Sequence, residues 1–599
     1  MRIGLLLIAF AVLANVATVL PAHAAADENP LPLSCDRSIV ANFKPNAETK
    51  VLIVKAYKKG DPFPEPPQES RFDPSAPPMM ATADLCLVKL HVGPGNPGPA
   101  DAPSTSAGIG IEVWLPAKDI WNGRVHAVGG SGWAGTEEAD PTKISSYTIS
   151  NDLSSAPFLA GKEGAVTAST DTGHTGGVMN GAFAMNPDGT INKPLWNDFA
   201  SRAIHQQVVM AKALAEAYYG AAPKFTYWDG ISTGGRQALK QAQRHPEDFD
   251  GILSVVPGIN WSKFLIANVY PQIVIQRDPG GRHLTPDQLN LVSNVAIEAC
   301  DLVDGKHLGF ILDNAACRYD PTKDQTVLCT ADGGSNHTAA CLTRKQALAI
   351  NKIWYGMTSD GSVPDPAVDN GISTLTDKRK WYGPPRGASL LALVGDAPFT
   401  IAVDMLALVL QDPTMATPSF QNAKANGADG WKSMSYEKLA QAFDAGIARQ
   451  PQFGDINTDD PDLTGFKARG GKLIHVQAMN DEPVPYLGSV NYYEQVLATM
   501  GGLSGVNTFY RFYRIPGMAH GSRNGTANPD ANPPVPKAHN AELYTVSTDW
   551  VEKGIQPGNT VLKSLSDKPS AKSLPMCAFP TKITHVGGSI NEAGSYECL

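Results

Sequence analysis

Three side chains of this 599-residue sequence have the types and the order needed to activate a serine hydroxyl. Ser232 stands within Gly230–Gly234, a G-x-S-x-G segment, and Asp481 and His520 follow separate hydrophobic runs later in the chain. A serine hydroxyl is a weak nucleophile until an imidazole takes its proton, and that imidazole needs a carboxylate to fix its tautomer. The order serine, acid, histidine therefore predicts nucleophilic catalysis, with Glu482 as an adjacent alternative acid.

The sequence around Ser232 predicts a sharp turn between a strand and a helix. In such a turn the serine has a strained backbone, and the flanking glycines let the strand and the helix approach closely. The backbone N–H of Thr233 would then face a developing oxyanion. We choose Gly132, in the glycine-rich segment 129–135, as the second donor. Because the motif alone is short, a glycine-rich surface turn is the alternative, and the surrounding elements must decide.

Segments with strand character alternate with helical segments on both sides of Ser232. We expect helices at 199–219 and 486–500, and strands at 109–115, 124–128, 164–169, 249–256, 472–479 and 509–515. This alternation is typical of a parallel sheet with crossover helices. The sequence therefore predicts an α/β fold of the α/β-hydrolase type, with Asp481 and His520 each in a loop directly after a strand.

The spacing of these three residues along the chain is uneven. Ser232 and Asp481 are 249 residues apart, whereas Asp481 and His520 are only 39 apart. Residues 259–465 contain helical segments, four clustered cysteines and long loops. We predict that 259–465 is a large inserted lid domain and that the hydrolase domain consists of residues 27–258 and 466–599.

Composition and the first residues predict an exported protein, either secreted or periplasmic. Residues 1–24 have a positive charge, an apolar run and small residues before Ala25, as in a signal peptide; an N-terminal membrane anchor is the alternative. Eight cysteines in an exported chain indicate disulfides. The net charge is −9 and no basic run is present, so we expect no nucleic-acid partner. No later segment has membrane length, so we expect no membrane partner after signal removal.

Several motifs together resemble the tannase/feruloyl esterase family, which also contains mono(2-hydroxyethyl) terephthalate hydrolase. They are Ser169–His174, Asp198–His205, Tyr218–Gly220, Ser232–Arg236, Ala242–Gly251 and Pro516–His520. The resemblance covers nearly the whole mature chain. It implies a secreted serine esterase with a lid domain, acting on esters of aromatic acids such as gallate, hydroxycinnamates or terephthalate monoesters. The catalytic triad of the family falls on Ser232, Asp481 and His520 in this sequence. We expect that the reaction requires no cofactor.

The sequence departs from the family pattern beside the serine and the histidine. Family members typically carry a cysteine before that serine and another after that histidine, joined as a disulfide. Here these positions are Ile231 and Gly521. We therefore expect a looser or differently stabilised site. By similarity, the remaining cysteines pair as Cys35–Cys86, Cys300–Cys317, Cys329–Cys341 and Cys577–Cys598.

A second departure affects the calcium ion that the resemblance implies for the lid. In the loop Cys300–Gly309 the carboxylates Asp301 and Asp304 remain, but Leu308 replaces a third carboxylate. Calcium takes about six to eight oxygen ligands, and its affinity depends on their charge. We therefore expect at most a weak calcium site, and a metal-free loop that keeps its fold is the alternative.

A segment of the predicted lid contains candidate substrate-binding residues. Trp381, Arg386 and Phe399 lie in a lid segment that could cover the pocket. Arg386 could pair with a substrate carboxylate, and a solvated surface position is its alternative. A non-catalytic or degenerate hydrolase-fold binding protein is one alternative function. An amidase or thioesterase is another, because the same triad operates in both.

Overall fold

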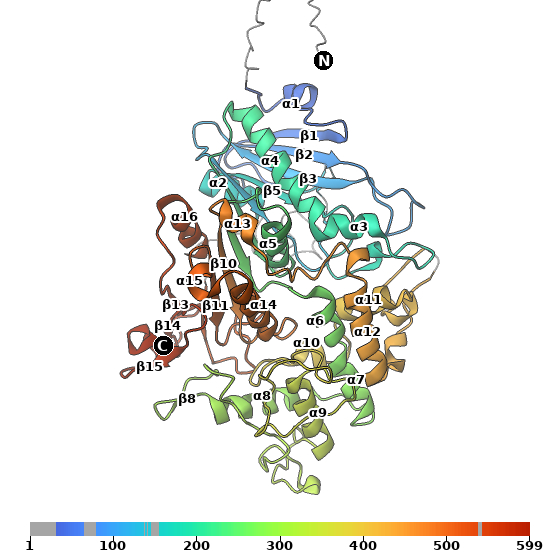
Figure 1. Cartoon of the computed structure of the whole chain (residues 1–599), viewed down its shortest axis with the longest axis vertical. Coiled ribbons are helices and arrows are strands. Elements are labelled where there is room, and N and C mark those ends of the chain that lie inside the picture. Colours follow the sequence, from blue (N-terminus) through green and yellow to red (C-terminus); the bar gives the residue numbers. More distant parts are fainter. Residues whose placement is uncertain are drawn as a thin grey trace, which may run out of the picture.

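The structure, a computed structural model, describes residues 32–599 apart from 65–79, 137, 141, 145–154, 424 and 537–541. Within these residues a nine-stranded sheet has the order β1-β2-β3-β5-β4-β6-β7-β10-β11 (Figure 1). The signal peptide predicted at residues 1–24 lies outside the described residues.

The sheet has an antiparallel edge and a parallel centre. Its strands are β1 (Thr49–Tyr57), β2 (Leu85–Val92), β3 (Ile109–Pro116), β4 (Arg124–Val128), β5 (Val166–Thr170), β6 (Phe225–Ile231), β7 (Gly251–Val255), β10 (Lys472–Ala478) and β11 (Tyr510–Ile515). β1, β2, β3 and β5 pair antiparallel, whereas β5, β4, β6, β7, β10 and β11 pair parallel. The strands predicted from the sequence are present within two residues of their expected bounds.

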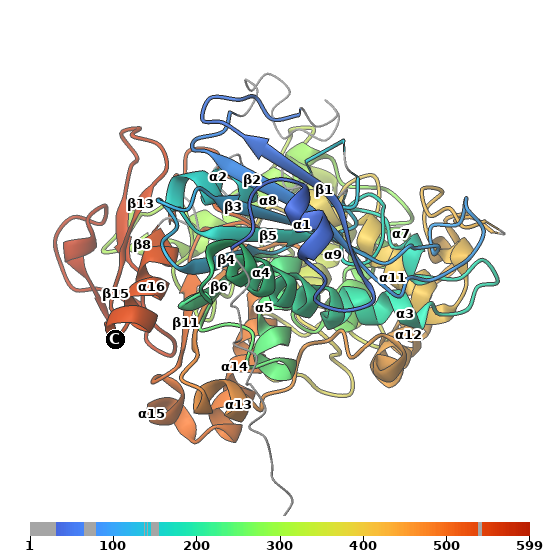
Figure 2. The same cartoon turned by 90° about the horizontal axis from the view of Figure 1, so that it is seen from above.

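Helices cover both faces of the parallel strands. Neighbouring side chains of a strand point to opposite faces. On β6, Trp228 therefore packs in a cluster with Leu239 of α5 (Thr233–Arg244), whereas Tyr227 packs with Trp550 of α16 (Tyr544–Lys553). Figure 2 shows α4 (Ala203–Tyr219) and α5 along β4 and β6. The remaining helices of this part are α1 (Arg37–Asn42), α2 (Ala156–Glu163), α3 (Lys193–Asn197), α14 (Tyr486–Thr499) and α15 (Gly502–Val506).

Between β7 and β10 the chain leaves the sheet and builds the helical region in the lower part of Figure 1. It contains α6 (Trp261–Ala267), α7 (Tyr270–Arg277), α8 (Pro286–Cys300), a hairpin of β8 (Leu302–Val303) and β9 (Lys306–His307), α9 (Arg344–Tyr355), α10 (Leu391–Val394), α11 (Thr400–Leu410) and α12 (Tyr436–Ala448). The last helix before β10, α13 (Thr464–Ala468), lies beside α5. Capping boxes at Thr285 and Thr343 fix the starts of α8 and α9, because side chain and backbone satisfy each other there.

The core of this lid continues into the hydrolase domain. Trp261 of α6 packs edge-on against Trp133, with 5.3 Å between ring centroids, and lies 5.6 Å from Phe199. All three side chains belong to one buried cluster that also contains the core of α11. The lid is therefore packed firmly onto the hydrolase domain, and the domain bounds 259 and 465 stay a prediction.

The C-terminal residues form small sheets beside the lid. They contain β12 (Pro534–Val535), β13 (Val561–Ser564), β14 (Ser573–Pro575), β15 (Ile583–His585) and β16 (Tyr596–Cys598). The structure has the four disulfides that the resemblance implied, Cys35–Cys86, Cys300–Cys317, Cys329–Cys341 and Cys577–Cys598. No helix of the described residues combines the length and the apolar character needed to cross a membrane.

Candidate active site

Ser232 occupies the turn between β6 and α5 in a strained backbone conformation, with φ 61° and ψ −118°. The two glycines of the motif are required by close contacts. A Cβ added to Gly230 would lie 2.4 Å from the carbonyl carbon of Gly234, and one on Gly234 would lie 3.1 Å from the Cα of Gly129. The strand–turn–helix element predicted from the sequence is therefore present, and the surface-turn alternative is wrong.

Arg236, in the first turn of α5, fixes this helix against the hydrolase domain. Its backbone N–H donates to the Ser232 carbonyl at 3.0 Å. Its buried guanidinium donates to the carbonyls of Phe199 and Ala200 at 3.0 and 2.9 Å. These carbonyls belong to a π-helical turn at Asp198–Arg202, which precedes α4. The arginine of the Ser232–Arg236 motif thus positions the helix that carries the serine.

Ser232, His520 and Asp481 form one hydrogen-bonded chain at the ends of β6, β11 and β10. The Nε2 atom of His520 lies 2.8 Å from Ser232 Oγ, and its Nδ1 atom lies 2.7 Å from Asp481 Oδ2. The other Asp481 oxygen accepts the Val484 N–H at 2.9 Å, and the carboxylate is fully buried. This arrangement can fix the imidazole tautomer and transfer the serine proton.

Glu482, the alternative acid, has a different set of partners. Its carboxyl oxygens accept hydrogen bonds from the backbone N–H groups of Ala392 and Leu393 in the lid, at 3.1 and 2.7 Å. Burial raises the pKa of Glu482 to about 8, and the negative charge of Asp481 acts in the same direction. His520 is therefore paired with Asp481, whereas Glu482 connects the loop after β10 to the lid.

The two positions that depart from the family pattern face each other. A Cβ added to Gly521 would lie 3.9 Å from Cδ1 of Ile231, which is van der Waals distance. Hydrogen bonds within the neighbouring loops add support. Asn480 accepts the Gly517 N–H through its side chain at 3.1 Å, and its own N–H donates to the Met518 carbonyl at 2.9 Å. The partly buried Ile231 side chain packs against the cluster that contains Met518, and Asn480 fixes the loop of His520 by hydrogen bonds.

Thr233 and Gly132, the residues predicted to stabilise an oxyanion, lie together beside Ser232. The Thr233 hydroxyl donates to the Gly132 carbonyl, and both residues line the same cavity as Ser232. Gly132 has φ 48°, and an added Cβ would lie 2.1 Å from the carbonyl oxygen of Val178. Only glycine fits at position 132. That the N–H groups of Thr233 and Gly132 bind the oxyanion stays a prediction.

A cavity of about 480 Å³ opens beside Ser232 and His520, between the hydrolase domain and the lid. Pockets for small organic molecules have volumes of about 300 to 1,000 Å³. The apolar lining is Met179, Trp261, Phe264, Leu265, Leu391, Phe399, Ile401 and Val484. The polar side chains are Ser131, Ser389, Asn480, Glu482, Arg523, Asn524 and Thr526. The cavity can therefore hold a flat apolar group with a few polar substituents.

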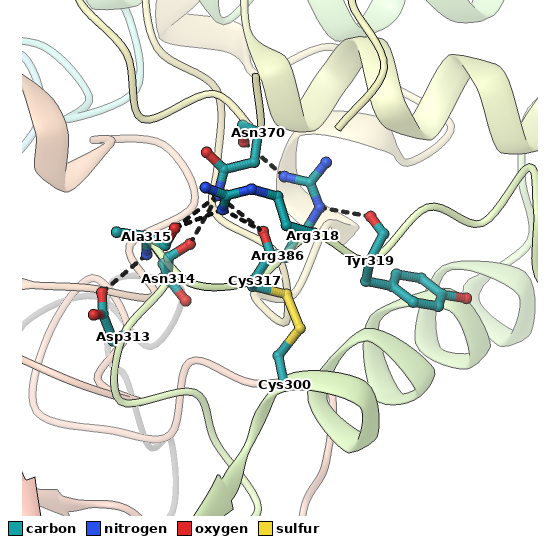
Figure 3. The surroundings of a disulfide bond; sticks show 9 residues. All are labelled: Cys300, Asp313, Asn314, Ala315, Cys317, Arg318, Tyr319, Asn370 and Arg386. Atoms are coloured by element: carbon teal, nitrogen blue, oxygen red, sulfur yellow. Dashed lines mark hydrogen bonds between the residues drawn. A yellow bond between two sulfur atoms is a disulfide. The ribbon is translucent and has the colours of Figure 1, made fainter. Parts of the chain in front are cut away.

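Phe399 lines this cavity, but Arg386 does not belong to it. The Arg386 side chain donates from Nε to the Tyr319 carbonyl at 2.9 Å and from Nη1 to the Asn370 carbonyl at 2.7 Å (Figure 3). Its guanidinium also lies 5.2 Å from the Trp354 ring, and burial lowers its pKa to about 10. The predicted substrate contact is wrong, and so is the solvated alternative. Arg386 is a buried structural residue near Cys300–Cys317.

Trp381 is also placed away from the cavity, so its predicted substrate contact is wrong. The indole is 3% exposed and packs against Tyr382 and Phe443, with ring centroids 5.4 and 6.4 Å away. A Cβ added to Gly488 of α14 would lie 3.1 Å from this indole. The sequence could not distinguish an aromatic residue of the lid core from one of the cavity wall.

The residues at the implied calcium site do not fit a calcium ion. One Asp301 oxygen lies 2.7 Å from His307 Nδ1, and the other accepts the Gly309 N–H at 2.7 Å. Leu308 is buried in an apolar cluster with Leu574 and Tyr596, so that position offers no carboxylate. Asp304 lies in the tight β8–β9 turn, with φ 49°. Asp301 and Asp304 therefore belong to a hairpin in which His307 and the Gly309 N–H already bind the Asp301 carboxylate.

Arg523 is a cavity residue that the sequence analysis missed. It lies three residues after His520 in the same loop, and its exposed guanidinium has no hydrogen-bond or ion-pair partner among the described residues. Proximity to His520 in the sequence was an available signal for it. Glu482 was considered only as an acid, because no local pattern showed that it contacts the lid.

The fold and the site together define this chain as an α/β-hydrolase. Its sheet has a parallel centre with helices on both faces, and the ends of β6, β10 and β11 present serine, acid and histidine in that chain order. The chain belongs to the tannase and feruloyl esterase family, whose model matches residues 97–599. It is therefore a carboxylic ester hydrolase.

Related sequences and solved structures agree with this assignment. A probable feruloyl esterase of Arthroderma benhamiae is 30% identical over 551 residues, which is 88% of each chain. Probable feruloyl esterase B-2 of Aspergillus terreus is 27% identical, with 87% of each chain covered. Feruloyl esterase B from Aspergillus oryzae has a TM-score of 0.71 at 24% identity, covering 94% of this chain and 99% of that one. Tannin acyl hydrolase from Aspergillus niger has a TM-score of 0.65 at 22% identity, covering 94% and 95%. The predicted fold and family are confirmed.

Proposed function

We propose that this protein is an exported serine esterase that cleaves esters of aromatic acids through an acyl-enzyme. The hydrogen-bonded chain Ser232–His520–Asp481, which opens into an aromatic-lined cavity, is the observation that supports this proposal most directly. Export is supported by the signal-like residues 1–24 and by the four disulfides.

In the first half-reaction, Ser232 Oγ attacks the ester carbonyl carbon while His520 Nε2 takes its proton. The tetrahedral intermediate carries a negative oxygen, which the N–H groups of Thr233 and Gly132 stabilise. His520 then gives the proton to the leaving alcohol, and the acyl group stays on Ser232. Asp481 keeps the imidazole in the required tautomer and stabilises its charged form.

In the second half-reaction, water attacks the acyl-enzyme and His520 acts as general base again. The products are the free acid and Ser232 with its hydroxyl restored. No metal ion or organic cofactor is needed for either half-reaction, since the protein supplies the nucleophile, the base and the oxyanion donors.

The aromatic acid class rests on the cavity wall and on the named relatives. Trp261, Phe264 and Phe399 line the cavity beside Ser232. Aromatic rings pack favourably against flat apolar groups in edge-to-face or offset contacts. The relatives are named feruloyl esterase and tannin acyl hydrolase, which points to hydroxycinnamate or gallate esters. Terephthalate monoesters complete the range of substrates that we propose.

The decisive experiment compares hydrolysis of methyl ferulate, methyl gallate, a terephthalate monoester and p-nitrophenyl acetate by wild type and Ser232→Ala. We expect aromatic esters to be preferred, and kcat to fall by about 10⁴-fold or more in the variant. A fluorophosphonate probe should label Ser232, as located by peptide mass spectrometry. Circular dichroism of both proteins controls for folding.

The same experiment separates the alternative functions. Matched anilides and thioesters of the preferred acid are added to the panel. Faster turnover of an anilide or a thioester than of the ester would favour an amidase or a thioesterase. A folded wild type that neither hydrolyses any substrate nor reacts with the probe would be a degenerate binding protein, and the proposal would then be wrong.

A further inference from the structure

One group of potential metal ligands lies outside the catalytic cavity, where α4, the end of α5 and the following loop meet. His205 belongs to α4, His245 ends α5, and Asp248 lies in the loop that leads to β7. One ligand atom from each of these residues lies within 4.8 Å of the other two. Among the described residues this is the one group of three or more histidine, cysteine and acidic residues with such spacing. We propose that it binds one divalent transition-metal ion of the Zn²⁺ type.

The pair His205–Asp248 already has nearly the separation of two ligands on one ion. His205 Nδ1 lies 3.1 and 3.0 Å from the two carboxylate oxygens of Asp248. Zinc bonds of about 2.0 to 2.1 Å in a tetrahedral arrangement place neighbouring ligand atoms about 3.3 Å apart. An ion can therefore replace the proton between His205 and Asp248 with a small widening of this pair.

His245 supplies the third ligand and lies against the face of the His205 ring. The two imidazoles are stacked, with 4.0 Å between ring centroids and 16° between ring planes. A rotation of the partly exposed His245 side chain brings one of its nitrogens to the ion. Glu247 lies beside His245, with Oε1 3.7 Å from Nδ1, and this carboxylate or a water molecule completes the coordination.

The backbone that carries these ligands is fixed on both sides. The N–H of Asp248 donates to the His245 carbonyl at 3.0 Å, and the N–H of His245 donates to the Gln241 carbonyl at 2.8 Å. Lys212 Nζ donates to the carbonyls of Asp248 and Glu247 at 2.5 and 3.4 Å, so it holds the loop through its backbone. Asp248 is 2% exposed, whereas the side chains of His205 and His245 are 26% and 27% exposed. The site thus has a buried anchor and an open side through which an ion can enter.

The ligand types favour transition-metal ions over Ca²⁺ and Mg²⁺. Two imidazoles and one carboxylate suit Zn²⁺, Ni²⁺, Co²⁺ and Cu²⁺, whereas Ca²⁺ and Mg²⁺ require oxygen ligands. The ion would connect α4 to the end of α5 and thereby stabilise the fold. Since α5 has 12 residues, His245 lies about 18 Å along the helix from the turn of Ser232. We therefore expect the ion to raise the melting temperature and to leave kcat unchanged.

The test uses the mature protein without a polyhistidine tag, freed of metal by a chelator and dialysis. Isothermal titration with Zn²⁺ at pH 7.5 measures stoichiometry, and Co²⁺ absorption reports the coordination geometry. We expect one ion per chain and a visible Co²⁺ band typical of four-coordinate sites. The key variant is His245→Phe, because phenylalanine keeps the stacking on His205 but has no ligand atom. Its Kd for Zn²⁺ should rise at least tenfold, and its melting temperature should no longer respond to the ion.

Two control variants exclude other histidines. His337→Ala removes an exposed histidine of the lid and should bind Zn²⁺ like wild type. His520→Ala removes the imidazole of the catalytic cavity and should also keep the stoichiometry of one. Equal Zn²⁺ affinity of wild type and His245→Phe, no measurable binding by folded wild type, or loss of the ion only in His520→Ala would each overturn the proposal.

Discussion

Glu482 Oε1 accepts a hydrogen bond of 2.7 Å from the backbone N–H of Leu393, and this contact joins the loop of Asp481 to the lid. Leu393 belongs to α10, and the neighbouring Ala392 donates to the other Glu482 oxygen at 3.1 Å. Ala392 and Glu482 both line the catalytic cavity. The position of the lid over the cavity is therefore coupled to the residue next to the acid of the proposed triad.

The ionisation of Glu482 should make stability depend on pH. Its pKa is raised from 4.5 to about 8 by burial, so the folded protein holds a proton that the unfolded chain loses near pH 4.5. The stabilising contribution is complete below about pH 4.5 and is lost as pH rises through about 8, by up to about 1.4 kcal/mol per pH unit. Glu482→Gln, which stays neutral, should flatten the dependence of melting temperature on pH between 5 and 8. Parallel curves for wild type and variant would contradict this prediction.

Arg523 should favour substrates that carry a negative charge. Its guanidinium lines the cavity without an ionic partner among the described residues, so a substrate carboxylate would gain an ion pair there. Exposed ion pairs contribute about 0.2 to 1 kcal/mol. Arg523→Gln should therefore raise KM for a terephthalate monoester about two- to fivefold. KM for the neutral methyl ester of the same acid should stay constant, and Arg523→Lys should retain most of the effect. Equal KM changes for both esters would show that charge is not recognised.

The Ile231 side chain should help to hold the distance between Ser232 and His520. It faces Gly521, where an added Cβ would lie 3.9 Å from Cδ1. Ile231→Ala removes packing of this side chain against the cluster that contains Val255 and Met518, and should cost about 1 to 3 kcal/mol of stability, as for a partly buried large-to-small change. It should also lower kcat more than it raises KM, because the reacting groups lose their alignment. Ile231→Val is the matched control with a smaller effect, and unchanged kcat in Ile231→Ala would refute the idea.

Calcium should have no effect on stability, because the protein already satisfies the Asp301 carboxylate. Addition of millimolar CaCl₂ to metal-free protein should leave the melting temperature unchanged. Asp301→Ala should lower it, since the Gly309 N–H loses its partner at a cost of about 1 to 3 kcal/mol. Asp304→Asn, in the adjacent turn, is the control and should have little effect. A calcium-dependent rise in the wild-type melting temperature that Asp301→Ala abolishes would contradict the structure.

The sequence alone determined the elements that present the proposed triad. The strand, turn and helix around Ser232 follow from local sterics, because Gly230 and Gly234 are the residues that permit the close approach. The strands before Asp481 and His520 follow from short runs rich in β-branched, aliphatic and aromatic residues, which favour strands. Local chemistry and chain order were therefore sufficient to place these three residues.

Only the tertiary structure decided the roles of the lid residues. Arg386 and Trp381 have the types of substrate-binding residues, but the carbonyl groups that bind Arg386 come from Tyr319 and Asn370, which no local pattern connects to it. Glu482 received its link to the lid from residues about 90 positions away, and burial raises its pKa. Burial and long-range hydrogen bonds depend on how distant segments pack. A side chain's type limits what it can do, whereas packing decides what it contacts.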